Sequence, residues 1–141
     1  MKKLKAAVLL FFLFAIAIPM YTSAATPAKN VEIYNIKKRE VTSIITPNEK
    51  IQKEAEKMIK QITGVYKKLD PLPKEGYMVK IPLEPSVPVK NQWLNGYVDE
   101  LIIIIPNEQT SHILVFDDEN NPHFFTCKND QQPPMELFNL K

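Results

Sequence analysis

The run YVDELIIIIPNEQTSHILVFDDENNPHFFTC, residues 97–127, contains three short apolar segments separated by polar turns. The segments are 97–105, 112–116 and 123–127, and all three are rich in the β-branched and aromatic residues that favour strands. Proline, asparagine and aspartate fill the short connections, as is typical of tight turns. This pattern predicts an antiparallel meander.

Two of these segments lack the alternation of a strand that has one face in water. Residues 101–105 and 113–116 are apolar at every position, so apolar side chains are expected on both faces of the sheet. One helix covers only one face. The other face then needs cover from the N-terminal segment, residues 135–140, a second subunit, or a bound ligand or partner. If it stays open it is an association site, with Ile102 and Ile104 as candidate binding residues and a homodimer as one outcome.

An amphipathic helix is predicted to begin after residue 45. Thr46 is expected to be the N-cap, and Pro47 is expected to be the first helical residue. Glu49, three residues after Thr46, is the acid of the capping box. Apolar residues then recur at steps of three and four, which indicates one buried stripe. The stripe consists of Ile51, Ala55, Met58, Ile59, Ile62, Tyr66 and Leu69. Gly64 is a possible end of the helix, and the proline-rich run 70–73 stops it.

Three further strands complete the expected fold. Residues 31–36 and 41–45 are predicted to pair as a hairpin, and 77–83 is predicted to be a strand ending at a proline. The fold class is therefore α+β: one amphipathic helix packed on a largely antiparallel sheet in the order β-β-α-β-β-β-β. Residues 26–127 form the expected single domain, and 128–141 form a polar, proline-containing tail.

Three prolines follow the strand at a spacing of three residues. Pro82, Pro85 and Pro88 fit the period of polyproline II, so the segment is interpreted as a rigid loop between strands, with a docking ligand for an aromatic groove as the less favoured interpretation. Trp93 lies in the turn 91–96 that follows and is expected to tuck against the core. These four residues are also candidate binding residues.

The first 25 residues have the three parts of a secretory signal peptide. Lys2, Lys3 and Lys5 precede an uninterrupted apolar run at 6–18, and small residues follow. Cleavage is expected near Ala24 or Ala25, and an uncleaved N-terminal membrane anchor is the alternative. We expect a secreted or cell-envelope protein that meets a membrane only through this segment.

Composition narrows the class of protein. The 141 residues are 45% hydrophobic and 24% charged, which is typical of a globular domain rather than a disordered chain. Removing residues 1–25 takes away three lysines and no acid, which leaves 15 basic and 16 acidic side chains and a net charge of about −1. Nucleic-acid binding therefore loses its support. A single cysteine, Cys127, permits no intrachain disulfide.

The hairpin from Asp117 to Cys127 contains side chains that could act as nucleophile, base or metal ligand. A two-residue loop at Glu119 and Asn120 puts His112 opposite Cys127, within reach of a thiolate–imidazole dyad, although a cysteine on an apolar face is more often inert. The oxygen-rich run 117–121 lacks the glycine and glutamate that an EF-hand requires, so a turn explains it better than calcium. No catalytic residue, metal site or cofactor is predicted.

These patterns predict an exported, small, non-enzymatic binding domain. Its partner is an unknown protein or cell-envelope component. The alternative is a small hydrolytic or metal-dependent extracellular enzyme that uses the Asp117–Cys127 hairpin.

Overall fold

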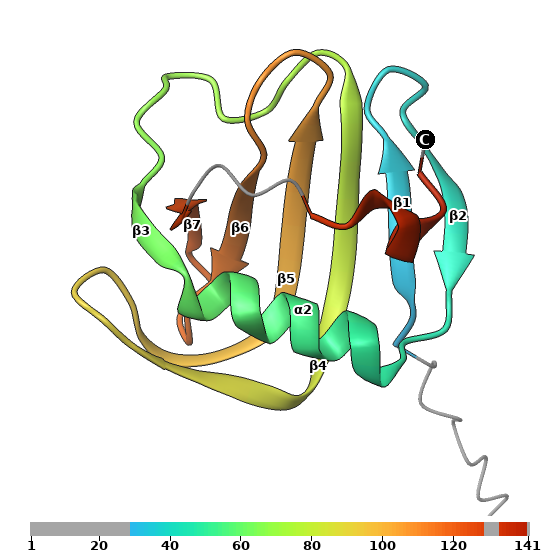
Figure 1. The fold of residues 1–141 in the computed structure, drawn as a ribbon. Coiled ribbons are helices and arrows are strands. Elements are labelled where there is room, and N and C mark those ends of the chain that lie inside the picture. Colours follow the sequence, from blue (N-terminus) through green and yellow to red (C-terminus); the bar gives the residue numbers. More distant parts are fainter. Residues whose placement is uncertain (1–28, 129–132, 141) are drawn as a thin grey trace, which may run out of the picture.

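The computed structural model describes residues 29–128 and 133–140, so the expected signal peptide lies outside the described residues. Figure 1 shows one helix, α2 (Glu49–Lys60), lying across a seven-stranded sheet. The strands, in chain order, are β1 (Val31–Asn35), β2 (Glu40–Ile45), β3 (Ile62–Val65), β4 (Gly76–Lys90), β5 (Asn95–Pro106), β6 (His112–Phe116) and β7 (Pro122–Cys127). A short 3-10 helix, η2 (Met135–Phe138), follows. None of the helices in these ranges is long and apolar enough to cross a membrane.

All the strand pairs are antiparallel, and the sheet order is β2-β1-β4-β5-β6-β7-β3. The predicted meander is confirmed as β5 to β7, and the predicted N-terminal hairpin as β1 and β2. β4 pairs antiparallel with β5 and so extends the meander by one strand. The α+β class, with one helix on an antiparallel sheet, is therefore confirmed.

The core lies between the sheet and α2. A row of apolar side chains crosses five neighbouring strands on this side of the sheet, and each is at most 1% exposed. The row consists of Ile33, Val79, Ile103, Ile113 and Phe125. Ile51, Ala55 and Ile59 of the helix are fully buried in the same cluster, as the predicted stripe requires.

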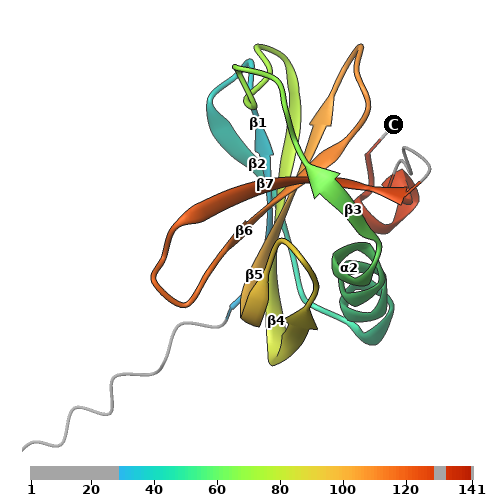
Figure 2. The ribbon, with the colours of Figure 1, turned by 90° about the vertical axis from the view of Figure 1, so that its left-hand side faces the viewer.

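The C-terminal segment packs on the same side of the sheet as the helix. Phe138 of η2 is 1% exposed and belongs to the main core cluster, with Met135, Leu137 and Leu140 packed against it. Figure 2 shows α2 and η2 together on one side, with the opposite face of the sheet turned away from both. This segment therefore does not cover the second face.

The helix begins two residues later than predicted. Asn48 is the N-cap, with extended backbone angles, and its side-chain oxygen accepts a hydrogen bond from the Ile51 backbone N–H at 3.0 Å. The prediction of Thr46 as the cap is wrong because Asn48 supplies the same acceptor closer to the apolar stripe, and asparagine caps at least as well as threonine.

The helix also ends earlier than its apolar stripe suggested. It stops at Lys60, and residues 62–65 form β3, a strand absent from the predicted order. β3 pairs with β7, and the contact continues as Tyr66 N–H donates to the Phe124 carbonyl. Thr63, Gly64 and Val65 are poor helix formers, so pairing with the open edge of β7 outweighs the weak helical periodicity.

The proline segment is strand rather than loop. Pro82 and Pro88 both lie in β4 and pair with β5, opposite Glu100 and Tyr97. The register shifts between Pro82 and Val87, so a bulge contains Pro85, whose peptide bond is cis. The predicted rigid loop is therefore wrong. Pro82 and Pro88 hold paired positions opposite β5, and the bulge accommodates Pro85, whose missing N–H a regular ladder would need.

Candidate functional site

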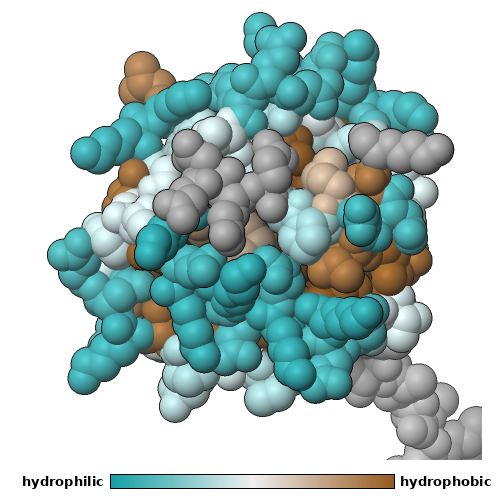
Figure 3. Space-filling view, in the orientation of Figure 1, coloured by the Kyte–Doolittle hydropathy of each residue, from teal (hydrophilic) through white to brown (hydrophobic). Residues whose placement is uncertain are grey.

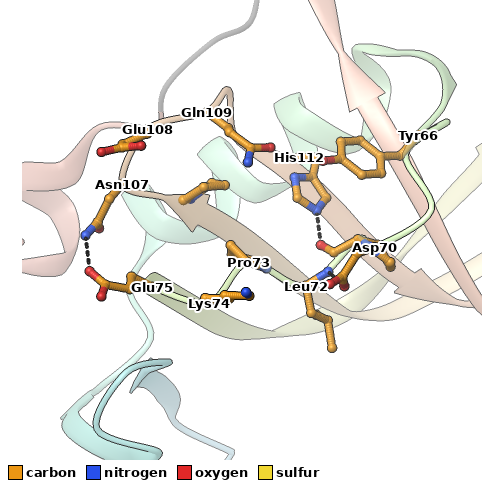
Figure 4. A pocket seen from close by; sticks show the side chains of 12 residues that line it. Tyr66, Asp70, Leu72, Pro73, Lys74, Glu75, Asn107, Glu108, Gln109 and His112 are labelled. Atoms are coloured by element: carbon orange, nitrogen blue, oxygen red, sulfur yellow. Dashed lines mark hydrogen bonds between the residues drawn. The ribbon is translucent and has the colours of Figure 1, made fainter.

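A cleft lies at one end of the sheet. The β3–β4 loop (residues 66–75) and the β5–β6 loop (107–111) form its walls, and His112 lies at its base (Figure 4). The cleft has a volume of about 490 Å³. It is lined by Tyr66, Asp70, Pro71, Leu72, Pro73, Lys74, Glu75, Pro106, Asn107, Glu108, Gln109 and His112.

His112 fastens one wall of the cleft to the sheet. Its Nε2 lies 2.6 Å from the Pro71 carbonyl oxygen, and since a carbonyl can only accept, Nε2 carries the proton. The imidazole also stacks on Tyr66, with ring centroids 3.9 Å apart. The side chain is 1% exposed, and its Nδ1 has no hydrogen-bond partner among the described residues. These contacts indicate a neutral histidine that holds the β3–β4 loop.

Burial is the main cause of the pKa shifts of His112 and Tyr66. Desolvation lowers the pKa of His112, and the Lys68 charge adds to the lowering, while the carbonyls of Pro71 and Thr110 oppose it. Burial also raises the pKa of the Tyr66 phenol, with a smaller contribution from the Asp70 carboxylate. Both side chains are therefore uncharged near neutral pH.

The cleft is lined mainly by polar and charged side chains. Two of the three carboxylates in its lining, those of Asp70 and Glu75, have structural partners. Asp70 Oδ1 accepts the Leu72 N–H at 3.2 Å, and Glu75 forms a salt bridge with Lys37 at 2.8 Å. Side-chain amides and carboxylates at the rim can form hydrogen bonds with a polar ligand.

The face of the sheet opposite α2 is called here the outer face, and its centre is a band of apolar side chains. The cross-strand register places on it Tyr34, Met78, Lys80, Ile102, Ile104, Leu114 and Phe124. Ile104 and Leu114 are buried, whereas Tyr34, Met78, Ile102 and Phe124 are half-buried. The predicted presence of apolar residues on both faces is confirmed.

The candidate binding residues named from the sequence do not form one site. Ile102 is half-buried on the outer face and Ile104 is fully buried beside His112. Trp93 is half-buried against the core in the turn after β4, as expected, where Asn91 accepts hydrogen bonds from the Trp93 and Leu94 backbone N–H groups at 2.8 Å.

The three prolines are likewise spread along β4. Pro82 is buried and its carbonyl accepts a 2.7 Å hydrogen bond from the Gln52 side chain, whereas Pro85 and Pro88 are exposed. None of the six candidate residues lines the cleft.

The pairing of His112 with Cys127 does not form. Phe116 lies opposite Pro122, one residue out of the predicted register, and His112 pairs with Ile104 while Cys127 pairs with Ile62 of β3. The Cys127 thiol donates to the Met58 carbonyl at 3.5 Å, and burial raises its pKa to about 11. Cys127 is therefore an unreactive core residue.

The register differs because the turn has three residues rather than two. Asp117 Oδ1 accepts the backbone N–H groups of Glu119 and Asn121 at 3.0 and 2.8 Å, and Asn120 adopts a left-handed backbone. His123 donates from Nε2 to Asp117 Oδ2 at 2.8 Å, and this bond is the main reason that the pKa of Asp117 lies well below its usual range. No group of three metal-ligating side chains occurs within residues 29–128 and 133–140.

Sequence reasoning missed the contact at the base of the cleft. It assigned Tyr66 to the helix stripe and considered His112 only as a partner of Cys127. The available indication was the proline-rich run 70–73, which stops regular structure immediately after Tyr66 and lets the chain turn back over β6.

Comparison with known proteins finds no match to a family model, to a curated protein or to a solved structure, so the functional argument depends on the chain's own residues.

Proposed function

We propose that the mature chain is an exported, non-enzymatic binding module that engages a protein partner through its outer face. The observation that carries this proposal is the half-buried apolar band on that face, to which neither α2 nor η2 packs. Apolar side chains left half-buried on a sheet gain stability when a partner removes them from water.

The contacts of the reactive side chains support binding over catalysis. The Cys127 thiol is buried with a pKa of about 11, His112 is bonded to a backbone carbonyl, and His123 is bonded to the turn aspartate. These three groups, which an enzyme of the alternative class could use as nucleophile or base, are committed to holding the fold.

The outer face also has features that suit a specific partner. Lys80 of β4 and Glu32 of β1 form a 2.9 Å salt bridge on this face, next to Ile102, and both side chains are about one-third exposed. A polar pair within an apolar band sets orientation and excludes mismatched partners, whereas the apolar residues supply affinity.

Site-specific photo-crosslinking tests the proposal. A photoreactive residue placed at Ile102, in protein exported by its own cell, is expected to give a discrete crosslinked adduct. The same residue at Lys53, which points to solvent from α2, is the matched control. An Ile102→Asp substitution is expected to weaken recovery of the partner at least about tenfold, because a charge is placed against an apolar surface.

The mass of the adduct distinguishes the possible partners. An adduct of twice the chain mass identifies a homodimer, and an adduct with another protein identifies a heterologous partner. Equal adducts from both positions, or none from Ile102, contradict the proposal.

Export is the other half of the proposal. Mass spectrometry of the exported protein is expected to find an N-terminus near residue 25. An intact N-terminus in the membrane fraction supports the anchored alternative instead.

A further inference from the structure

Three connections meet at one end of the sheet. They are the β1–β2 turn (residues 36–39), the β3–β4 loop (66–75) and the β5–β6 loop (107–111), and together they are called here the loop end (Figure 1). They lie together because neighbouring antiparallel strands alternate in direction, so alternate connections fall at the same end. The β4–β5 and β6–β7 turns lie at the opposite end.

The loop end presents apolar side chains to water. Leu69 is fully exposed and Leu72 is 47% exposed, and both belong to the β3–β4 loop. A single exposed leucine is ordinary, but two that are three residues apart on one projecting loop form an apolar tip. Figure 3 shows an apolar protrusion above a mainly hydrophilic surface at this end.

Basic side chains share the loop end with the apolar tip. The loop end and the adjoining Glu40 carry six basic and four acidic side chains. Among the described residues, five of the basic ones form no salt bridge: Lys38, Arg39, Lys67, Lys68 and Lys74. At the opposite end, the β4–β5 hairpin from Glu84 to Asp99 and the β6–β7 turn carry five acidic side chains and one lysine. The molecule is therefore electrostatically polar even though its mature net charge is close to zero.

The loops of the loop end are tied to one another. Lys37 bonds Glu75 at 2.8 Å, Lys68 bonds Gln109 at 2.6 Å, and His112 bonds the Pro71 carbonyl. These contacts hold the apolar tip and the cations in fixed relative positions, which lowers the entropic cost of binding a surface.

We propose that the loop end docks on an anionic lipid bilayer, with Leu69 and Leu72 inserted between headgroups and the lysines and arginine of the loop end at the phosphates. Separate apolar side chains that project from among cations suit the interfacial layer of a membrane, where the chemistry changes from charged to apolar within a few ångströms. The acidic opposite end favours the same orientation, because an anionic surface repels it. This contact adds to the one expected through residues 1–25, and it does not depend on the outer face or its partner.

Vesicle co-sedimentation of the exported form tests the proposal, since the core cluster of that form lies within residues 31–140. The protein is expected to bind vesicles of phosphatidylcholine with about 30% phosphatidylglycerol and to bind pure phosphatidylcholine far more weakly. Raising the salt concentration from about 0.05 M to about 0.5 M is expected to release most of it.

Double variants test which side chains make the contact with the membrane. Leu69→Ser with Leu72→Ser is expected to weaken vesicle binding at least about tenfold, and Lys38→Gln with Lys67→Gln roughly 25-fold, or about fivefold per cation. The matched controls are Tyr97→Ser and Lys90→Gln, which change an exposed aromatic and a lysine in the β4–β5 hairpin and are expected to leave binding unchanged.

Fluorescence gives the orientation. The native Trp93 lies in the β4–β5 turn at the opposite end, so its emission is expected to stay constant on adding anionic vesicles. A Leu69→Trp variant is expected to gain a blue-shifted component that brominated lipids quench. Failure of the native protein to bind anionic vesicles, or undiminished binding by the double-serine variant, overturns the proposal; a protein that docks at the loop end is then the remaining explanation for the exposed leucines.

Discussion

Gly76 opens β4 with a backbone that side chains rarely adopt. Its φ is +127°, and a Cβ added there would lie 2.1 Å from the Ile105 carbonyl oxygen. Only glycine permits this close approach, which starts the longest strand pair of the sheet. At the cleft, the stacking of Tyr66 on His112 and the hydrogen bond from His112 to the Pro71 carbonyl determine where the β3–β4 loop lies.

A Gly76→Ala variant is expected to lose at least about 2 kcal/mol of unfolding free energy, because backbone strain and overlap with a backbone atom both oppose the new methyl group. Gly64→Ala is the matched control, since a Cβ there would meet only the Thr126 hydroxyl at 3.6 Å. Urea unfolding of the two variants measures the difference. Equal losses of stability would contradict the close approach at Gly76.

His112 is expected to make stability depend on pH. Because burial lowers its pKa in the folded state, the unfolded chain takes up its proton first as the pH falls. The unfolding free energy is therefore expected to decrease from about pH 6.5 down to the lowered pKa, and to change no further from this group below it. Asp117 affects stability in a separate pH range. Because its pKa is lowered in the folded state, stability is lost as the pH falls below about 4.

A His112→Phe variant isolates this effect. The phenyl ring can still stack on Tyr66 but does not titrate, so the slope of unfolding free energy between about pH 5 and 6.5 is expected to flatten even though the lost Pro71 hydrogen bond lowers stability overall. Thermal unfolding over this range measures it. The same slope in both proteins would show that His112 does not carry the pH dependence.

Elements that are specified by local pattern were predictable, and elements that depend on distant partners were not. The strands 97–105, 112–116 and 123–127 and the buried stripe of α2 follow from periodicity within each segment. β3 exists only because β7 offers an open edge, and nothing within Thr63, Gly64 and Val65 identifies that partner.

The same distinction applies to the candidate site. The apolar outer face follows from the unbroken run 101–105. The cleft instead depends on contact between Tyr66, which follows β3, and His112 in β6, and these two residues are separated in the chain by β4 and β5. A turn one residue longer than predicted was enough to move Cys127 away from His112, because register in a hairpin depends on loop length.

The start of α2 is an element whose cap can be tested directly. Asn48→Ala is expected to cost about 1 kcal/mol, because it removes the acceptor of the Ile51 N–H, whereas Thr46→Ala is expected to change stability by less than about half that amount. Chemical denaturation of the two variants decides between the two caps. A larger loss at Thr46 would restore the capping box predicted from the sequence.

At the scale of the whole molecule, the two sides of the sheet are not equivalent. α2 and η2 complete the core on one side, and the outer face keeps Tyr34, Met78 and Phe124 half-buried. The loop end adds cations and an apolar tip at one pole. These features underlie the proposals that the exported domain uses one face for a partner and one end for a membrane surface.

Oxidative footprinting tests the partner-bound face most directly, because methionine is half-buried on both sides of the sheet. Met78 lies on the outer face and Met135 lies on the side of α2. Brief hydroxyl-radical exposure of the protein in its own envelope fraction, compared with the purified protein, is expected to show lower oxidation of Met78 and an unchanged rate at Met135. Protection of Met135 instead, or equal oxidation of Met78 in both samples, would contradict binding through the outer face.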